Sequence, residues 1–391
     1  MIRILKVIGW PLCPGGHILS TLSLAQGIGR CGFEVFIASP EGPLLENFIS
    51  AGLRFIPCET LLEKSPWHLM AFFTLVRAVK KQNIKLIHAM DYKALYPCYL
   101  TAAYLGIPLI FTKAGGDVPK YRIPSISKVI VFSEELARGM RERYGDLISP
   151  IELIKERIDN SLFTPVESPS SQNKDLLNVF MAMRLEEGKR MWLETAINAM
   201  ENLKKRSIPF KFTLAGDGPL RKELENRISR IRRYSSGEFC FLGGVADPAM
   251  MVHCYRGSDI VIGHGQGVLE AMACGKPVVV LGSGSRGTIV GPETVKLICE
   301  YNFSGRHMDV YPEVGGDLAE MIIALKDDSQ RRINLERFSR RYIEEEYSLE
   351  VGIKKLAFLY RKSLDEPLIE TFPKALFWFL NLALFRNKVL E

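Results

Sequence analysis

The sequence lacks the cysteine and histidine spacings of metal sites, and it lacks the pattern of a secretion signal. Its eight cysteines are scattered without a C-x-x-C or Cys/His arrangement. Several fall inside predicted strands or helices, so we interpret them as reduced core residues. The first residues read as an apolar strand and not as a signal peptide, which predicts a protein that stays in the cytoplasm.

Neither sign of charge dominates, and the apolar tail is short. The net charge of +7 over 391 residues is mild, and the signs alternate in residues 331–346 as on a solvated helix. This balance predicts no nucleic-acid partner, but it permits an anionic acceptor or membrane surface. The apolar segment 376–385 has ten residues, too few to span a bilayer.

A dinucleotide-binding fingerprint is also missing. A NAD-dependent oxidoreductase would carry G-x-G-x-x-G after its first strand and an acid at the end of the second. The chain has Pro14-Gly15-Gly16 and then Ser39-Pro40 at these places. The pattern therefore disfavours that class.

Short apolar strands alternate with amphipathic helices along the whole chain. This alternation predicts an α/β fold of two Rossmann-like, doubly wound domains facing each other, with ligands at the carboxyl ends of the strands. The length exceeds a single core. We expect an N-terminal domain at 1–166, a polar linker at 167–175, a C-terminal domain at 176–348 and a helical tail at 349–391.

Residues 258–280 are the most informative stretch, because two apolar strands flank a glycine-rich loop and a short helix. The expected elements are the strand Ile260–Ile262, the glycines Gly263, Gly265 and Gly267, the helix Val268–Cys274 and the strand Val278–Leu281. Glycines let a ligand approach free N–H groups at a helix start, which favours phosphate. Glu270, expected in the first helical turn, can reach a hydroxyl group. Phosphate together with a polyol describes a nucleotide sugar.

This stretch resembles the EAMACGKPVV signature of the glycosyltransferase group 1 family (family 4), which has the two-domain GT-B fold. The resemblance implies that Glu270 contacts the donor ribose and that the backbone of Gly267 to Leu269 lies against the diphosphate. The family usually has another Glu eight positions earlier, where this chain has Ile262.

Two further segments resemble the same family. In NVFMAMRLEEGKR (178–190), Arg184 and Lys189 are five residues apart, the family's spacing for the pair that neutralises the donor diphosphate. In FTLAGDGPLRKELE (212–225), a strand ends at a glycine turn, and Pro219 is expected as the first helical residue. We interpret this turn as framework with a secondary ligand role. By resemblance, the loop that begins near Leu242 runs beside the nucleotide base of the donor.

The N-terminal half shows a weaker βαβ pattern. A strand at Ile2–Ile8, a glycine loop, a helix at Leu19–Arg30 and a strand at Phe33–Ala38 resemble the family's opening, in which the loop lies near the sugar and acceptor. A purely structural turn explains the glycines about equally well. Lys113 stands where the family commonly has His, and residues 156–157 replace its Asn-Gly.

The candidate residues fall into three groups. The catalytic group is Arg184, Lys189 and Glu270; the donor-binding group is Gly15, Gly16, Gly216, Gly218, Leu242, His264, Gly265, Gln266, Gly267, Val268 and Leu269; the acceptor-side candidates are His88, Lys113 and Asp117. A satisfied strand-end residue is the alternative for His88, and a solvated lysine for Lys113. The resemblance implies that no metal or other cofactor is required, and the sequence is consistent with this, since no D-x-D is present and Asp217 and Asp247 are isolated.

The resemblance implies a retaining, metal-independent hexosyltransferase that acts on a saccharide or lipid-linked acceptor in cell-surface polysaccharide or glycolipid synthesis. Two alternatives stay open: a non-catalytic nucleotide-sugar-binding relative, and a nucleotide-sugar epimerase or glycogen-phosphorylase-like enzyme on the same fold. The apolar segments 67–81 and 376–385 pack in the core or contact the inner face of the membrane at its surface.

Overall fold

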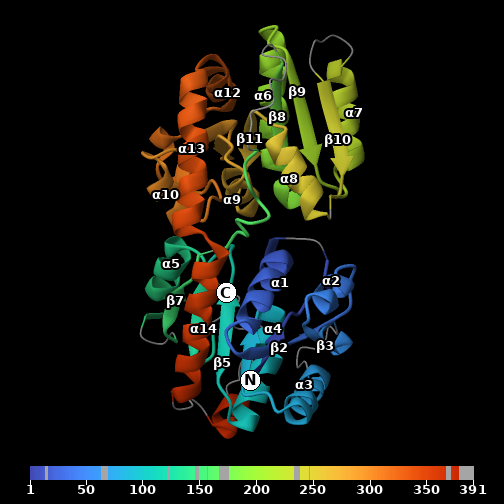
Figure 1. Ribbon diagram of the computed structural model, residues 1–391, viewed down its shortest axis with the longest axis vertical. Coiled ribbons are helices and arrows are strands. Elements are labelled where there is room, and N and C mark those ends of the chain that lie inside the picture. Colours follow the sequence, from blue (N-terminus) through green and yellow to red (C-terminus); the bar gives the residue numbers. More distant parts are fainter. Residues whose placement is uncertain are drawn as a thin grey trace. The chain divides into compact units, whose positions relative to one another are not determined.

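The computed structural model divides into two units, each built on a seven-stranded sheet covered by helices (Figure 1). The first unit comprises Met1–Arg157 and Leu349–Glu391, and the second comprises Ile158–Ser348. The structure describes residues 1–13, 16–62, 69–120, 123–145, 149–155, 157–166, 176–232, 238–245, 247–366 and 371–377. The predicted α/β class with two Rossmann-like sheets is confirmed.

The first sheet is entirely parallel, with the strand order β3-β2-β1-β4-β5-β6-β7. Its strands are β1 (Ile2–Val7), β2 (Phe33–Ser39), β3 (Arg54–Pro57), β4 (Leu86–Ala89), β5 (Leu109–Lys113), β6 (Lys128–Val131) and β7 (Ile151–Leu153). Its helices are α1 (Gly16–Gly29), α2 (Leu45–Ser50), η1 (Glu59–Leu62), α3 (Leu69–Gln82), α4 (Tyr92–Leu105), α5 (Glu134–Tyr144) and α14 (Leu349–Asp365).

Apolar side chains on both faces explain why this sheet lies between two helical layers. All four residues of β4 are buried, as are the first four residues of β5, and such strands need cover on each side. One core joins the sheet to α3, α4 and α5, and the other joins it to α1, α2 and α14. The C-terminal helix α14 therefore returns to the first unit, as expected.

The second sheet has the strand order β10-β9-β8-β11-β12-β13-β14, and β13 runs antiparallel to both of its neighbours, β12 and β14. Its strands are β8 (Leu177–Ala182), β9 (Phe210–Ala215), β10 (Glu238–Gly243), β11 (Ile260–Gly263), β12 (Val278–Leu281), β13 (Arg286–Ile289) and β14 (Gly316–Asp317). Its helices are η3 (Glu187–Lys189), α6 (Arg190–Lys205), α7 (Arg221–Arg232), α8 (Pro248–Arg256), α9 (Gln266–Ala273), α10 (Val295–Glu300), α11 (His307–Val310), η4 (Pro312–Val314), α12 (Leu318–Asp327) and α13 (Ser329–Glu346).

The boundary between the units falls earlier than the sequence indicated. The first unit ends at Arg157, ahead of the predicted linker 167–175, which lies outside the described residues. Contacts explain this division, because Phe163 packs edge-on against Tyr255 at 6.2 Å and Arg340 donates to the carbonyl of Phe163 at 2.8 Å. Both partners belong to the second unit.

One helix start of this unit also differs from the sequence prediction. α7 begins at Arg221, so Pro219 lies in the preceding turn and is not the first helical residue. The N–H of Leu220 donates to the carbonyl of Leu185 at 2.9 Å, which holds this turn against the loop after β8 and delays the helix. Asp247 caps α8 by accepting from the N–H of Ala249 at 2.9 Å.

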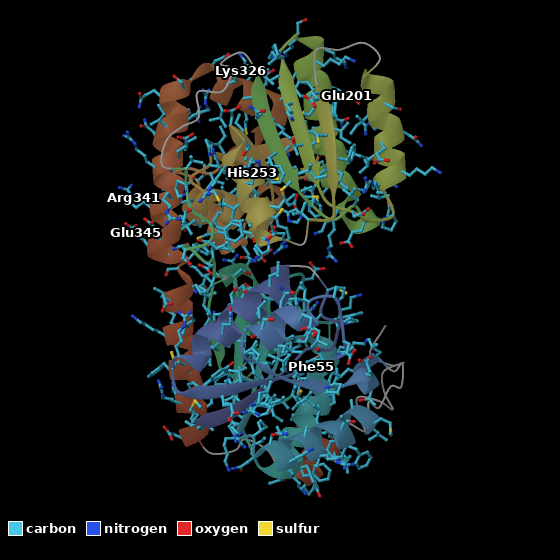
Figure 2. The ribbon with its side chains drawn as sticks, turned by 45° about the vertical axis from the view of Figure 1, so that its right-hand side comes forward. Phe55, Glu201, His253, Lys326, Arg341 and Glu345 are labelled. Carbon is cyan, nitrogen blue, oxygen red and sulfur yellow. The ribbon has the colours of Figure 1, made fainter. Side chains whose placement is uncertain are left out.

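α13 has the solvated face that its alternating charges predicted. Arg341 and Glu345 project outward from it (Figure 2), and both are exposed, while Leu335 and Ile343 are buried. Among the described residues, no helix is long and apolar enough to cross a membrane. The predicted tail segment 376–385 is described only to residue 377.

Candidate functional site

The candidate site lies at the carboxyl edge of the second sheet, where the strand order reverses. β8 pairs with β11, but the chain continues from β8 to β9 on one side and from β11 to β12 on the other. Loops that leave such a pair of strands diverge, and open α/β sheets bind ligands there. The predicted catalytic residues Arg184, Lys189 and Glu270 come from these two loops and the helices that follow them.

The start of α9 presents free backbone donors. α9 begins at Gln266, two residues earlier than predicted, and no side chain caps it. Gly265 has φ 64° and ψ −137°, a conformation that essentially only glycine adopts, and its N–H donates to the carbonyl of Phe303 at 2.7 Å. The first-turn amides of Gln266 and Gly267 thus combine with the helix dipole to favour an anion.

Glu270 lies in the second turn of α9, which corrects its expected place in the first turn. One carboxylate oxygen accepts from the hydroxyl of Tyr255 at 2.9 Å, and the other accepts from the side-chain amide of Gln266 at 2.8 Å. Burial raises the pKa of Glu270 to about 7, although both hydrogen bonds act in the opposite direction. The carboxylate is therefore held in one orientation by two neighbours.

Tyr255 is the residue that anchors Glu270. It is fully buried on α8, and its ring packs edge-on against Phe180 at 5.2 Å. Burial, followed by the nearby carboxylate of Glu270, raises the pKa of Tyr255 well above its usual value. Its hydroxyl therefore stays protonated and acts as the donor to Glu270.

The loop after β8 supplies positive charge. Arg184 is 70% exposed and forms an ion pair with Glu186 at 3.2 Å. The ammonium of Lys189 lies 4.8 Å from the centre of the Trp192 ring. Burial lowers the pKa of Lys189, and Arg184 and Arg306 lower it further, while Glu186 opposes them. Cations that repel one another in this way favour an anion between them.

His264 joins the two loops. Its ring packs against Trp192 at 4.7 Å and 62°, so Trp192 contacts both His264 and Lys189. Burial, followed by the charge of Lys189, lowers the pKa of His264 to about 4. Its Nε2 is buried and has no hydrogen-bond partner in the described part of the chain. A neutral imidazole with an unused nitrogen is therefore available at the start of α9.

Gly216 and Gly218 are framework residues. A Cβ at Gly216 would lie 1.9 Å from the carbonyl oxygen of Met183, and one at Gly218 would lie 2.4 Å from that of Leu185. The turn after β9 consequently packs directly on the loop that carries Arg184. Leu242 is partly buried in β10 and packs on the adjoining core.

The side chains of Val268 and Leu269 are fully buried in the core. Only their backbone is therefore accessible to a ligand. Ile262 is also fully buried, at the position where the family usually has its other Glu. This position therefore belongs to the core of the sheet in this chain.

Two family models match most of the chain. The model described as "Glycosyl transferases group 1" matches residues 177–302, and the model described as "Glycosyltransferase Family 4" matches residues 14–161. The chain belongs to the group 1 glycosyltransferases. No curated protein is a significant sequence match.

Solved structures share the fold of this glycosyltransferase. A glycosyltransferase from Rickettsia africae is 18% identical with a TM-score of 0.70, and the alignment covers 93% of this chain and 99% of that one. Anabaena HepE, in complex with UDP and glucose, is 18% identical with a TM-score of 0.67, covering 92% and 100%. Sucrose-phosphate synthase from Thermosynechococcus elongatus is 18% identical with a TM-score of 0.64, covering 93% and 99%.

The first unit of the glycosyltransferase holds the remaining candidates. Gly15 lies outside the described residues, and Gly16 is the first residue of α1. Lys113 ends β5 and donates to the backbone carbonyl of Gly115, within its own loop. Asp117 is exposed. Lys113 and Asp117 stay predictions.

His88 requires a correction. It is 1% exposed, and its two ring nitrogens pair with the hydroxyls of Tyr360 and Thr112, each at 2.7 Å. Burial lowers its pKa well below the usual value. His88 is a core residue that links α14 to the sheet, and it presents no free nitrogen to an acceptor.

Sequence reasoning missed Tyr255, Trp192 and Arg306. Tyr255 reads as an ordinary apolar position of a helix, and only its buried hydroxyl shows that it needs a polar partner. Arg306 lies in a segment without a recognised motif, so only the fold brings it near Lys189. Trp192 follows Lys189 by three residues, and the proximity of a cation and an aromatic ring was its one available signal.

Proposed function

We propose that this glycosyltransferase transfers a hexose from a nucleoside diphosphate-sugar to a saccharide or lipid-linked acceptor, with retention of anomeric configuration. The observation that carries the proposal is the link from Lys189 to the uncapped start of α9: Lys189 contacts Trp192, whose ring packs on His264 just before α9, and Arg184 and Arg306 act on Lys189. That arrangement suits a diphosphate, and Glu270 suits a ribose hydroxyl.

The cations also suit a departing diphosphate. Negative charge grows on the leaving group as the glycosidic bond breaks, so donors that are already in place stabilise the transition state more than the ground state. Arg184 and Lys189 carry this role in the proposal. In a retaining transfer on one face, a phosphate oxygen of the leaving group takes the acceptor proton.

Glu270 is preorganised for a hydroxyl group. Tyr255 and Gln266 fix both carboxylate oxygens, and each oxygen retains capacity for a further hydrogen bond. A ribose hydroxyl that donates to this carboxylate would be held equally in the ground state and the transition state. We therefore assign Glu270 to donor binding.

We propose that catalysis requires no divalent metal, because side chains and backbone amides supply the positive charge. Activity should persist in excess chelator. Loss of activity in EDTA that magnesium or manganese restores would overturn this point and direct attention to carboxylates near the diphosphate.

A thermal-shift screen tests the donor site directly. UDP is the first nucleotide to test, since HepE is in complex with UDP and with UDP-glucose, followed by GDP, ADP and their sugars. A ligand at a hundred times its Kd stabilises the folded state by roughly 2.7 kcal/mol. Lys189→Ala should reduce the shift, whereas Arg341→Ala, on the exposed face of α13, should leave it unchanged. No shift with any nucleotide would contradict the donor site.

A non-catalytic nucleotide-sugar-binding protein is the second candidate, and Ile262 favours it. A buried isoleucine cannot make the polar contact that the family's other Glu can make. Product analysis separates the candidates: transfer of the sugar supports the enzyme, an altered free nucleotide sugar supports an epimerase, and binding without either supports the non-catalytic protein.

We also propose peripheral contact with the inner face of the membrane through α3, during polysaccharide or glycolipid synthesis. Leu69, Met70 and Phe73 are 45%, 56% and 61% exposed, and two lysines lie in the last turn of the same helix. Exposed apolar residues beside basic ones are typical of helices that lie in a membrane surface. The opposite face of α3, with Ala71, Leu75 and Val79, is buried in the core.

Sedimentation with anionic liposomes tests this contact. Phe73→Ser should weaken sedimentation, while Phe358→Ser, which changes a 67% exposed residue of α14, serves as the control. Equal sedimentation of both variants would contradict the role of α3.

A further inference from the structure

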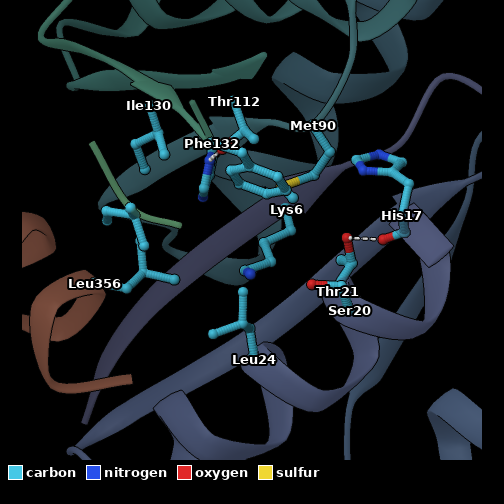
Figure 3. A pocket seen from close by; sticks show the side chains of 12 residues that line it. Lys6, His17, Ser20, Thr21, Leu24, Met90, Thr112, Ile130, Phe132 and Leu356 are labelled. Carbon is cyan, nitrogen blue, oxygen red and sulfur yellow. Dashed lines mark hydrogen bonds between the residues drawn. The ribbon is translucent and has the colours of Figure 1, made fainter. Parts of the chain in front are cut away.

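A small cavity lies inside the first unit, between the sheet on one side and α1 and α14 on the other (Figure 3). Within this cavity, the centre of a water molecule can occupy a volume of about 20 Å³. Leu24 of α1, Ile130 of β6 and Leu356 of α14 form apolar parts of its wall. A space of this size holds a single water molecule or an ion of similar radius.

Lys6 of β1 extends its ammonium group into this cavity (Figure 3). The side chain is fully buried, and its Nζ has no hydrogen-bond partner among the residues that the structure describes. Burial lowers the pKa of Lys6 to about 7, and no carboxylate of the described residues counteracts it. A buried amine without a counter-charge is unusual, because buried lysines are normally paired.

Hydroxyl groups lie around the same cavity. Ser20 and Thr21 of α1 and Thr112 of β5 line it. Thr21 donates to the carbonyl of His17 at 2.8 Å, and Thr112 pairs with Nε2 of His88 at 2.7 Å. Among the described residues, the Ser20 hydroxyl has no comparable hydrogen bond, so it can donate into the cavity.

The other ionisable groups around the cavity do not supply the missing negative charge. His17 lines it from α1, and burial lowers its pKa. His88 lines it from β4 and is held neutral between Tyr360 and Thr112. Asp91 acts on His17, but its carboxylate accepts from the N–H groups of Gly9 and Ala94 at 2.7 and 2.9 Å.

We propose that this cavity is a binding site for one monovalent inorganic anion of the size of chloride. The Lys6 ammonium supplies the charge, and the Ser20 hydroxyl donates a hydrogen bond. The apolar wall and the small volume favour a compact, weakly hydrated anion over phosphate or a carboxylate-bearing ligand. A single water molecule would satisfy hydrogen bonds but would leave the charge of Lys6 without compensation.

Anion binding depends on the protonation of Lys6. Chloride binds the ammonium form, so its affinity is highest below the pKa of Lys6 and falls about tenfold for each pH unit above that pKa. His17 and His88 are both depressed toward the neutral form, so they add little positive charge in the same range. Because α14 forms part of the wall, a bound anion should also stabilise the docking of this helix.

The test measures the line width of the chloride NMR signal with the full-length protein at about pH 6 and about pH 9. We expect broadening at the lower pH that largely disappears at the higher pH. Lys6→Met should abolish it, and Lys85→Met, which changes an exposed lysine beside β4, should preserve it. In thermal unfolding, sodium chloride should raise the Tm of the parent above that in sodium gluconate, but not that of Lys6→Met.

Two results would overturn the proposal. One is chloride broadening that is absent from the parent at the lower pH, which would assign the cavity to water. The other is broadening that is equal in the parent and in Lys6→Met, which would place chloride elsewhere. Should Lys6→Met fail to fold, Ser20→Ala provides the second variant, and unchanged chloride affinity in it would likewise overturn the proposal.

Discussion

In the proposed mechanism, Arg184 and Lys189 act on charge that develops during the reaction. Replacing either with alanine should lower kcat by roughly 10²-fold or more, the effect of losing one preorganised electrostatic donor. Steady-state kinetics with the donor identified by thermal shift would measure this. Arg341→Ala is the matched control, and a parent-like kcat in both site variants would make these residues surface charges.

Glu270→Gln should weaken binding of the donor without destabilising the folded protein. The ribose contact weakens in the ground and transition states alike, so the change should appear mainly as a higher KM for the donor. An unchanged KM would contradict the assignment. The glutamine can keep the hydrogen bond from Tyr255, and its amide can donate to the oxygen of Gln266, which is buried without a partner.

The pH dependence of stability gives a second measurement on Glu270. Its folded pKa of about 7 lies above the ordinary 4.5, so the folded state binds the proton more tightly and the parent loses stability as pH rises between these values. Glu270→Gln removes this loss. In urea unfolding at about pH 8 it should exceed the parent by roughly 1 to 3 kcal/mol, and the difference should shrink toward pH 5. A difference independent of pH would show that the carboxyl is not perturbed.

The residues of the site differ in how far sequence could reveal them. Glu270, Arg184 and Lys189 lie in short segments that resemble family motifs, and this resemblance identifies them as candidates. Arg306 and Tyr255 reach the site only through long-range packing, and no local pattern marks them. His88 shows the converse, because a strand-end histidine looked accessible until its two buried hydroxyl partners were known.

Among the elements, α14 makes a polar contact with the sheet inside an otherwise apolar core. Tyr360 is fully buried, packs edge-on against Phe33 at 5.6 Å and pairs with His88. Tyr360→Phe should lower the free energy of unfolding by about 1–3 kcal/mol, since it leaves a buried ring nitrogen without a partner. Phe358→Leu on the exposed face should change it by less than about 0.5 kcal/mol. Equal effects of the two changes in urea unfolding would contradict a structural role for the Tyr360 hydroxyl.

Strands were easier to predict than helix starts. β11 and β12 are continuous apolar runs, so their type and position followed from composition. α9 begins two residues early because Gly265 turns the chain before Gln266, and α7 begins late because its turn packs on the neighbouring loop. These starts depend on backbone geometry and tertiary hydrogen bonds, which a sequence pattern does not contain.

At the scale of the whole molecule, the second unit is continuous in sequence, and its first residue pairs with its last residues. The N–H of Ile158 donates to the carbonyl of Tyr347 at 3.0 Å, and Ile158 forms a bridge with Ser348. Both of its cores use only residues of this unit. We expect residues 158–348, expressed alone, to fold and to bind the nucleotide identified for the full chain.

Circular dichroism and a thermal shift with nucleotide would check this expectation. Residues 1–157 alone form the comparison, because they lack the α14 residues that complete their core, and they should not unfold cooperatively. An unfolded 158–348 fragment would show that the second unit depends on the first.

The second unit interrupts the first in the sequence. This order has a consequence for synthesis on the ribosome. The first unit needs Ile353, Leu356 and Tyr360 to cover one face of its sheet, so it cannot complete its core until α14 has been translated. The second unit finishes earlier, although it begins later. For the time between, the face of β1 that carries Lys6 lacks its α14 cover, and the nascent chain carries an incompletely covered apolar sheet that chaperones can recognise.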